Sequence, residues 1–293
     1  MNNFTSENSV KQKEKVERKL SNVYNLPSLP LIILEVGRLI EDPKTNASQL
    51  GKVISKDQGL VTKILTVANS PLYGIPRKVS TIDFAIVILG FSHIKNIVVA
   101  LTMMDTLKTS GTEKFSQRKF WLHSLMTATA AKKIADDLGF SATGEIFTMG
   151  LLHDLGIPVI YKYFPKEYAE IVKAVKNDGL TYAEAENDVL GINHQEIGAY
   201  LLEQWNLPSN LSKVVEMHHN PSSEQNFSKF VSLTHLADYM TNKLKTGEFE
   251  WDKDLAIDNR IIDTLNMGDT EYLENFIMSY EQIFKSQIES LNI

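Results

Sequence analysis

The sequence predicts an all-α protein, and three observations lead to this fold class. Apolar residues recur at helical spacing through most of the 293-residue chain. No segment shows the alternation of polar and apolar residues that is typical of a half-buried strand. The composition, with 43% hydrophobic and 23% charged residues, is ordinary for a globular protein with a substantial core. The length suits one large or two closely packed helical units.

The first half of the chain carries signals for several short helices. Residues 1–20 are expected to be mobile or loosely helical, and residues 21–110 to form an N-terminal helical bundle. A helix should begin after Pro30 and end at Asp42-Pro43, because the residue before a proline avoids the helical conformation. Ser80, with Asp83, predicts the N-terminal cap of an apolar helix that ends at Leu89. Other helices are expected at 48–54, 57–68 and 92–107, with Asn69 as a left-handed cap before Pro71.

The segment 109–111 is the expected boundary to a second helical bundle, residues 111–245. Pro165 suits the first position of a helix, Gly179 suits a helix end, and Asn193 followed by Glu196 suits a helix start. Residues 246–293 should form a helical tail. The helices expected here are 116–138, 144–157, 165–177, 181–190, 194–205, 209–219 and 228–245, and in the tail 258–265 and 270–291.

Charge and composition exclude several classes of function. The net charge of −6 argues against a nucleic-acid-binding protein, which needs a concentrated basic surface to hold phosphates. The absence of cysteine excludes disulfides, thiolate metal sites and a cysteine nucleophile. The polar N-terminus has no signal-peptide core, and the longest apolar stretch, 84–91, is too short to cross a bilayer. We therefore expect a cytoplasmic protein without membrane or nucleic-acid partners.

The histidines are the residues that point to chemistry. Five of the seven combine with two aspartates in a pattern that spreads over several predicted helices. Helices of a bundle can direct such side chains to one central point. Imidazole and carboxylate together suit Fe, Mn, Zn or Ni and do not choose among them. The candidate ligands are His123, His153, Asp154, His194, His218, His219 and Asp238.

The charges of such a site favour phosphate chemistry. Two divalent ions and two aspartates leave a net charge of +2, which would attract hydroxide and phosphate. A single histidine on a helix is more often an ordinary packed residue, and this interpretation is given to His93 and His235, although His235 could also support the site as a hydrogen-bond donor. The adjacent pair His218-His219 would be weak evidence alone, since neighbouring helical residues point about 100° apart.

Several motifs resemble a known family. The arrangement His…His-Asp…Asp, with LLHDLG at 151–156, resembles the HD superfamily of metal-dependent phosphohydrolases. This resemblance implies that His123, His153, Asp154 and Asp238 hold one metal ion. His194 and the pair at 218–219 match the additional ligands of the HD-GYP phosphodiesterases, with Asp154 bridging to a second ion. LPSLP at 26–30, ISKDQGL at 54–60, ANSPLYG at 68–74 and AIVILG at 85–90 resemble the HDOD family of bacterial signalling proteins, over residues 20–240.

The sequence also departs from the HD-GYP pattern. Ile157 occupies the position of a lysine that would orient a phosphate, and Pro158 is expected to kink or end its helix. Residues 220–226 replace the GYP motif, and Lys119 stands where some HD-GYP proteins carry a glutamate for a third metal ion.

Two functions therefore stay open. The first is a regulatory HDOD protein with a binuclear metal site that acts by binding other signalling proteins or a nucleotide-type ligand. The second is a metal-dependent phosphohydrolase acting on a nucleotide, a cyclic nucleotide or a cyclic dinucleotide, with weak or absent activity. Only in the second case would Asp154 have a catalytic role, through metal-activated water.

Overall fold

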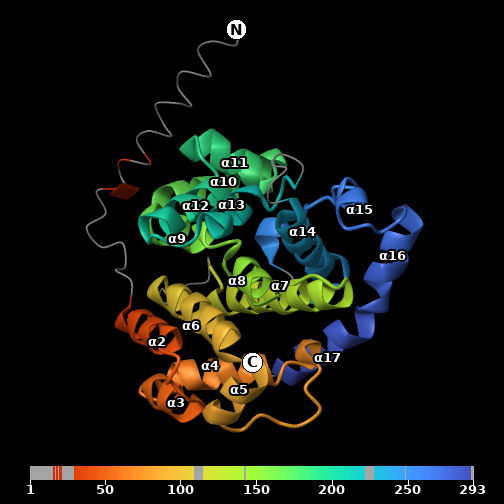
Figure 1. Cartoon of the computed structure of the whole chain (residues 1–293). Helices are drawn as coiled ribbons and strands as arrows, with labels where there is room; N and C mark the ends of the chain where they lie inside the picture. The colour runs from red at the N-terminus through yellow and green to blue at the C-terminus, as the bar shows by residue number, and fades with distance from the viewer. Residues whose placement is uncertain are drawn as a thin grey trace.

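The structure is a computed structural model, and every regular element in its described residues is helical or 3-10 helical (Figure 1). The described residues are Val16, Arg18, Leu20, Ser21 and the ranges 30–108, 115–141, 143–221, 228–247 and 249–291. These ranges contain no β-strand, which confirms the predicted fold class. Most of residues 1–20 and the expected boundary at 109–111 lie outside them, so the domain limits stay predictions.

The N-terminal half is a bundle of short helices at one end of the molecule (Figure 1). Asn46 caps the second of these helices in a capping box with Gln49. The helix that ends at Leu89 is capped by Thr81, whose side chain accepts a hydrogen bond from the backbone N of Phe84, and not by the predicted Ser80. Asn69 is not left-handed; its side chain instead bonds to both backbone groups of Val79. The elements are α2 (Leu31–Glu41), α3 (Ala47–Ile54), α4 (Gln58–Ala68), the 3-10 turn η1 (Pro71–Tyr73), α5 (Ile82–Leu89) and α6 (Phe91–Thr106).

The second half is a larger bundle in which α7 packs against both α8 and α14. The predicted signals at Pro165, Gly179 and Asn193 are confirmed, the last as a capping box with Glu196. The helices are α7 (Gln117–Asp137), α8 (Thr143–Leu152), α9 (Gly156–Tyr163), α10 (Pro165–Asp178), α11 (Tyr182–Leu190), α12 (His194–Gln204), α13 (Ser209–Met217) and α14 (Ser228–Lys243).

Two predicted helices of this bundle are wrong in their extent. The segment 144–157 forms two helices, because the chain turns at 153–155 between α8 and α9. Pro158 lies in the first turn of α9, where its missing N–H leaves no helical hydrogen bond unmade, so it does not end the helix. Helix α13 stops at Met217, before the histidine pair at 218–219. Both breaks fall beside candidate ligands.

The C-terminal tail returns along the side of the molecule to the N-terminal half (Figure 1). Its α17 packs against η1, where the fully buried Gln287 accepts a hydrogen bond from the Ser70 hydroxyl. Tyr280 interrupts the predicted helix 270–291 and donates to Asp137 of α7. The elements are η2 (Glu250–Asp252), α15 (Ile261–Thr264), α16 (Thr270–Ser279) and α17 (Glu281–Leu291).

The two halves meet where α6 packs against α8. His93 of α6 packs against the rings of both Tyr73 and Phe147, which also contact each other, and its Nε2 is 2.6 Å from the Tyr73 hydroxyl. No single helix in the described ranges is both long and apolar enough to span a bilayer; α5 and α6 pass that criterion only as a pair bent by 118°.

Candidate metal centre

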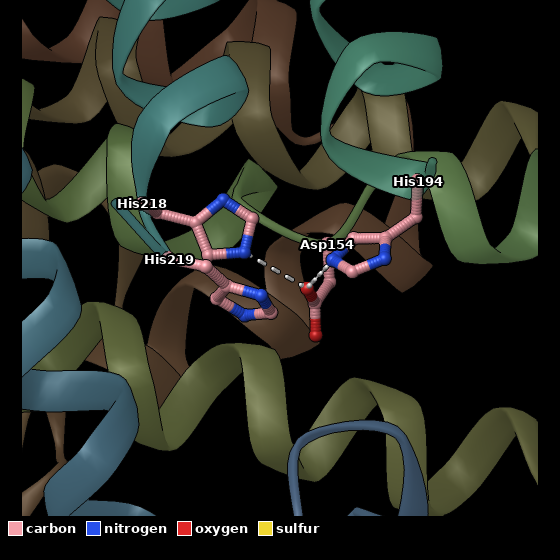
Figure 2. A group of neighbouring side chains, drawn as sticks. All are labelled: Asp154, His194, His218 and His219. Carbon is pink, nitrogen blue, oxygen red and sulfur yellow. Dashed lines mark ion pairs between the residues drawn. The ribbon is translucent and has the colours of Figure 1, made fainter. Parts of the chain in front are cut away.

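The seven candidate ligands come from three helices, from the turn between α8 and α9, and from the turn that follows α13. They converge as two adjoining groups of donor atoms, the second of which is drawn in Figure 2. The first group is His123 of α7, His153 of the turn and Asp238 of α14; the second is Asp154 of the turn, His194 at the start of α12, and His218 and His219 at the end of α13.

Close helix packing at two glycines places the turn that carries His153 and Asp154. A Cβ atom on Gly150 would lie 2.8 Å from Cα of Ala128, so only glycine lets α8 approach α7 this closely. A Cβ atom on Gly156 would lie 1.9 Å from the carbonyl oxygen of His194, so α9 begins directly against the start of α12. The turn between the two glycines is therefore held at the centre of the bundle.

The helix breaks explain how adjacent residues can point to one site. In a continuous helix the side chains at 153 and 154 would diverge by about 100°. Because α8 has ended, both instead face the cluster, and their Nε2 and Oδ2 atoms are 3.2 Å apart. His218 and His219 likewise follow the end of α13, with ring centroids 4.2 Å apart.

The carboxylate of Asp154 lies between the two groups. Its Oδ2 is 3.5 Å from Nε2 of His123, and its Oδ1 is 3.6 Å from Nε2 of His194 and 3.5 Å from Nε2 of His218 (Figure 2). Each oxygen thus faces a different set of imidazoles. This is the arrangement of a carboxylate that can bind two ions at once.

Asp238 also contacts both sides of the cluster. Its Oδ1 is 3.2 Å from Nε2 of His123, and its Oδ2 is 3.6 Å from Nε2 of His219. The second aspartate is therefore closer to His219 than its assignment to the first ion alone predicts.

Backbone carbonyls orient three of the imidazoles. Nδ1 of His153 is 2.7 Å from the carbonyl oxygen of Gly150, and Nδ1 of His218 is 2.7 Å from that of Val215. Nδ1 of His123 is 3.1 Å from the carbonyl oxygen of Gly247. A neutral imidazole that donates from Nδ1 has its lone pair on Nε2, the atom that faces the cluster. These rings are therefore set in the tautomer that binds a metal.

His194 is oriented by a carboxylate that the sequence analysis missed. Oε2 of the fully buried Glu186 is 2.8 Å from both the backbone N and Nδ1 of His194. Oε1 of the same carboxylate accepts from Nε1 of Trp251 at 2.5 Å. A carboxylate behind a metal-binding histidine is a common supporting arrangement. Nothing in the local sequence of α11 marks Glu186, since its role depends on a contact with another helix.

His235 supports the site from α14. Its Nδ1 is 2.8 Å from the carbonyl oxygen of His218, and its Nε2 accepts from the backbone N of Asp258 at 3.0 Å. Its spacing of three residues from Asp238 was the available signal, although an ordinary packed residue was the preferred interpretation.

The electrostatics of the cluster favour charged carboxylates. Burial raises the pKa of Asp154, but the imidazoles of His153, His218 and His194 together outweigh this and hold that pKa well below its usual range. Burial lowers the pKa of His218 to about 3, and His219 adds to the effect. Burial also opposes protonation of His194, but the carboxylates of Glu186 and Asp154 together outweigh it and raise the pKa of His194.

The residues present fit a divalent cation. Both oxygens of Asp154 and the Nε2 atoms of His194 and His218 are buried and accept or donate no hydrogen bond of normal geometry. Unpaired polar atoms are costly in a protein interior, and a cation would satisfy all four. The separations of 3.2–3.6 Å exceed most hydrogen bonds and match ligand atoms that each lie about 2.1 Å from a shared ion.

The chain matches the family model described as "HDOD domain" over residues 26–221. An uncharacterized protein of Treponema pallidum is 26% identical over 231 residues, which are 78% of this chain; the match spans less than half of that relative, 44%. The family match confirms the resemblance to the HDOD family that the sequence motifs indicated.

Solved structures show the same fold. An HDOD domain protein of unknown function from Geobacter sulfurreducens has a TM-score of 0.75 at 23% identity, covering 98% of this chain and 99% of that one. A protein of Shewanella amazonensis, provisionally named a phosphohydrolase, has a TM-score of 0.69 at 26% identity, with 93% and 97% covered. A protein of Marinobacter aquaeolei, provisionally named a signal transduction protein, has a TM-score of 0.72 at 18% identity, with 98% and 67% covered. With two thirds of its length matched by the family model, this chain belongs to the HDOD domain family.

Proposed function

We propose that this chain is a regulatory HDOD protein whose binuclear metal centre binds a ligand or maintains a conformation that partner proteins recognise. The observation that carries this proposal is the complete, enclosed donor set. All seven predicted ligands converge, and six of them have side chains that are at most 1% exposed, with only His219 more open, at 18%. A site so thoroughly surrounded by protein suits a bound ion better than an exchanging substrate.

The ligands divide naturally between two ions. His123, His153 and Asp238 would hold one, and the three histidines at 194, 218 and 219 the other, with Asp154 shared. The division is supported by the two oxygens of Asp154, each of which faces one group. Bound divalent ions would supply Lewis acidity to this site. The chain itself supplies the orientation of each imidazole and the exclusion of water.

A phosphohydrolase is the second candidate. The intact ligand set favours it, as does the 26% identity to the Shewanella protein named for that activity. Against it, the described residues that pair with Asp154 and Asp238 are all histidines, with no lysine or arginine among them to stabilise a transferring phosphate. Ile157, at the position of the missing lysine, is fully buried in the core.

Metal content and turnover test the proposal together. Chain purified without a His tag should bind two transition-metal ions, and Asp154→Asn should lose most of both, because the substitution keeps the shape and removes the shared charge. Asp188→Asn, on an exposed position of α11, is the matched control and should bind two ions. Cyclic dinucleotides and simple phosphodiesters should be hydrolysed slowly or not at all by the manganese- or iron-loaded protein.

Two results would decide against this function. Absence of metal after reconstitution would remove the binuclear centre. Rapid wild-type turnover that disappears in Asp154→Asn would make the protein an enzyme.

A further inference from the structure

A cavity of about 670 Å³ lies beside the metal cluster, between α7, α10 and the segment that follows α14. Its volume falls in the range of small-molecule sites. Five aromatic residues line it, namely Phe115, Tyr168, Tyr182, Phe249 and Trp251. Within this wall, Trp251 stacks between Tyr168 and Tyr182, at centroid distances of 5.3 Å and 4.0 Å. The wall is a preformed apolar surface; because the two tyrosines cover both faces of the indole, a planar ring would pack against the wall without stacking on Trp251.

Three lysines line the same cavity. Lys173 and Lys176 lie on one face of α10, three residues apart, and Lys119 faces them from α7. Of the described residues that line the cavity, Glu250 alone is acidic, in a chain whose net charge is −6. No acidic side chain among the described residues forms an ion pair with any of the three lysines. Like charges this close on a helix are unfavourable, and an anion would offset their repulsion.

Two residues of the wall contact the supports of the metal cluster. The ring of Phe249 stacks on that of His123, with centroids 5.8 Å apart and an interplanar angle of 26°. Trp251 donates to Glu186, which in turn holds His194. Each group of metal ligands is therefore one or two side chains from the cavity.

We infer that this cavity binds a nucleotide, with its phosphate at the lysines and its base against the aromatic wall, and that occupancy alters metal affinity through Phe249 and Trp251. The second part rests on the function proposed above, whereas the first does not need a metal. Lys119 thus has a use that its place in the sequence does not show, as part of an anion site.

Calorimetric titration of the full chain with GMP and AMP tests the binding. Guanosine and inorganic phosphate serve as probes that lack the phosphate or the ring, and each should bind more weakly than the nucleotides. Lys173→Ala combined with Lys176→Ala should weaken nucleotide binding about tenfold, since two charge contacts from exposed lysines are removed. Glu250→Gln should tighten it. Lys166→Ala, an exposed lysine of α10 outside the cavity, is the matched control and should change nothing.

Several outcomes would overturn the binding site. The first is no heat of binding at roughly millimolar nucleotide, a concentration that already corresponds to weak affinity. The second is that inorganic phosphate binds as tightly as the nucleotides. The third is that Lys166→Ala weakens nucleotide binding as much as the double lysine variant does. Loss of nucleotide binding in Asp154→Asn, under conditions in which the metal-free wild type still binds, would also overturn it, because the ligand would then contact Asp154 in the metal cluster.

The coupling is measured separately. By linkage, a nucleotide that alters metal affinity must have its own affinity altered by metal to the same factor. Equal nucleotide affinities with and without bound metal would refute the coupling and leave the cavity site standing. If the wild type binds no metal, the proposed function fails, while the titrations of the metal-free chain still decide the cavity.

Discussion

Glu186→Gln is the substitution that best separates the two groups of metal ligands. The carboxylate accepts three hydrogen bonds in a fully buried position, two from His194 and one from Trp251. Glutamine keeps the shape but offers one oxygen and one NH₂ group. If the oxygen faces His194, the NH₂ group meets the indole N–H of Trp251, donor against donor; the opposite orientation places two donors of His194 against it.

The magnitude follows from this geometry. The preferred orientation leaves the Trp251 N–H without an acceptor, which should lower the free energy of unfolding by about 1–3 kcal/mol. His194 keeps its hydrogen bonds but loses the charge behind its imidazole. Loss of such a partner typically lowers metal affinity about 10–100-fold. The effect should fall on the ion held by residues 194, 218 and 219, and spare the ion held by His123, His153 and Asp238.

The assay combines two measurements. Metal content is determined at a series of buffered free-metal concentrations, and thermal unfolding of the metal-free chain is followed by circular dichroism. Adding Trp251→Phe to Glu186→Gln removes the clashing donor, so the double variant should regain part of the lost stability but none of the lost metal affinity. Wild-type affinity for both ions in Glu186→Gln would refute the reasoning, as would an equal loss at both.

Three further predictions concern stability. Gly156→Ala should destabilise the fold by about 1–3 kcal/mol and weaken metal binding, because its Cβ would overlap the His194 carbonyl oxygen. Gly37→Ala, where a Cβ meets nothing within 4 Å, should instead stabilise α2 by about 0.5–1 kcal/mol. Equal shifts of the unfolding temperature in the two variants would contradict this. Burial, aided by Lys132, lowers the pKa of His93 from 6.5 to about 4, so the unfolded chain binds its proton first and stability falls as pH drops from about 6.5 to 4, by about 3 kcal/mol. In urea titrations at several pH values, the unfolding free energy of His93→Gln should lose this part of its pH dependence. The same change of unfolding free energy with pH in wild type and variant would count against the prediction. Gln287→Leu should cost about 1–2 kcal/mol in urea unfolding because Ser70 loses its acceptor, whereas the exposed Gln282→Leu on the same helix should not, and matching midpoints would refute the contact.

Most helix starts and ends could be predicted from the sequence, because the residues that cap a helix are close to it in the chain. The capping box at Asn193 and the stop at Gly179 depend on backbone groups within a few residues, and both were placed from the sequence. The break at 153–155 was not, because its cause is the contact of Gly156 with His194 of another helix. A pattern of apolar residues continues through such a turn and does not reveal it.

The ligands of the site could be named from the sequence, but their supports could not. Histidines and aspartates are uncommon enough in helix interiors to stand out, so a spaced set of seven is informative. Glu186 resembles any other glutamate of a helix with exposed acidic residues, and only its contact with His194 shows its role. The cavity beside the cluster was likewise invisible, because its aromatic wall joins residue 115 with residues near 168, 182 and 250.

The C-terminal tail connects the two halves of the molecule. The chain leaves the N-terminal half through α6, passes through the bundle that holds the metal cluster, and comes back through α17 to dock at residues 70–73. The C-terminal helices therefore connect the two halves in addition to the contacts that α6 makes with α8 and η1 makes with α7. A rotation of one half against the other must either carry α16 and α17 along or pull Gln287 from its buried position. Removing α16 and α17 should therefore allow the two halves to rotate against each other more freely than in the intact chain.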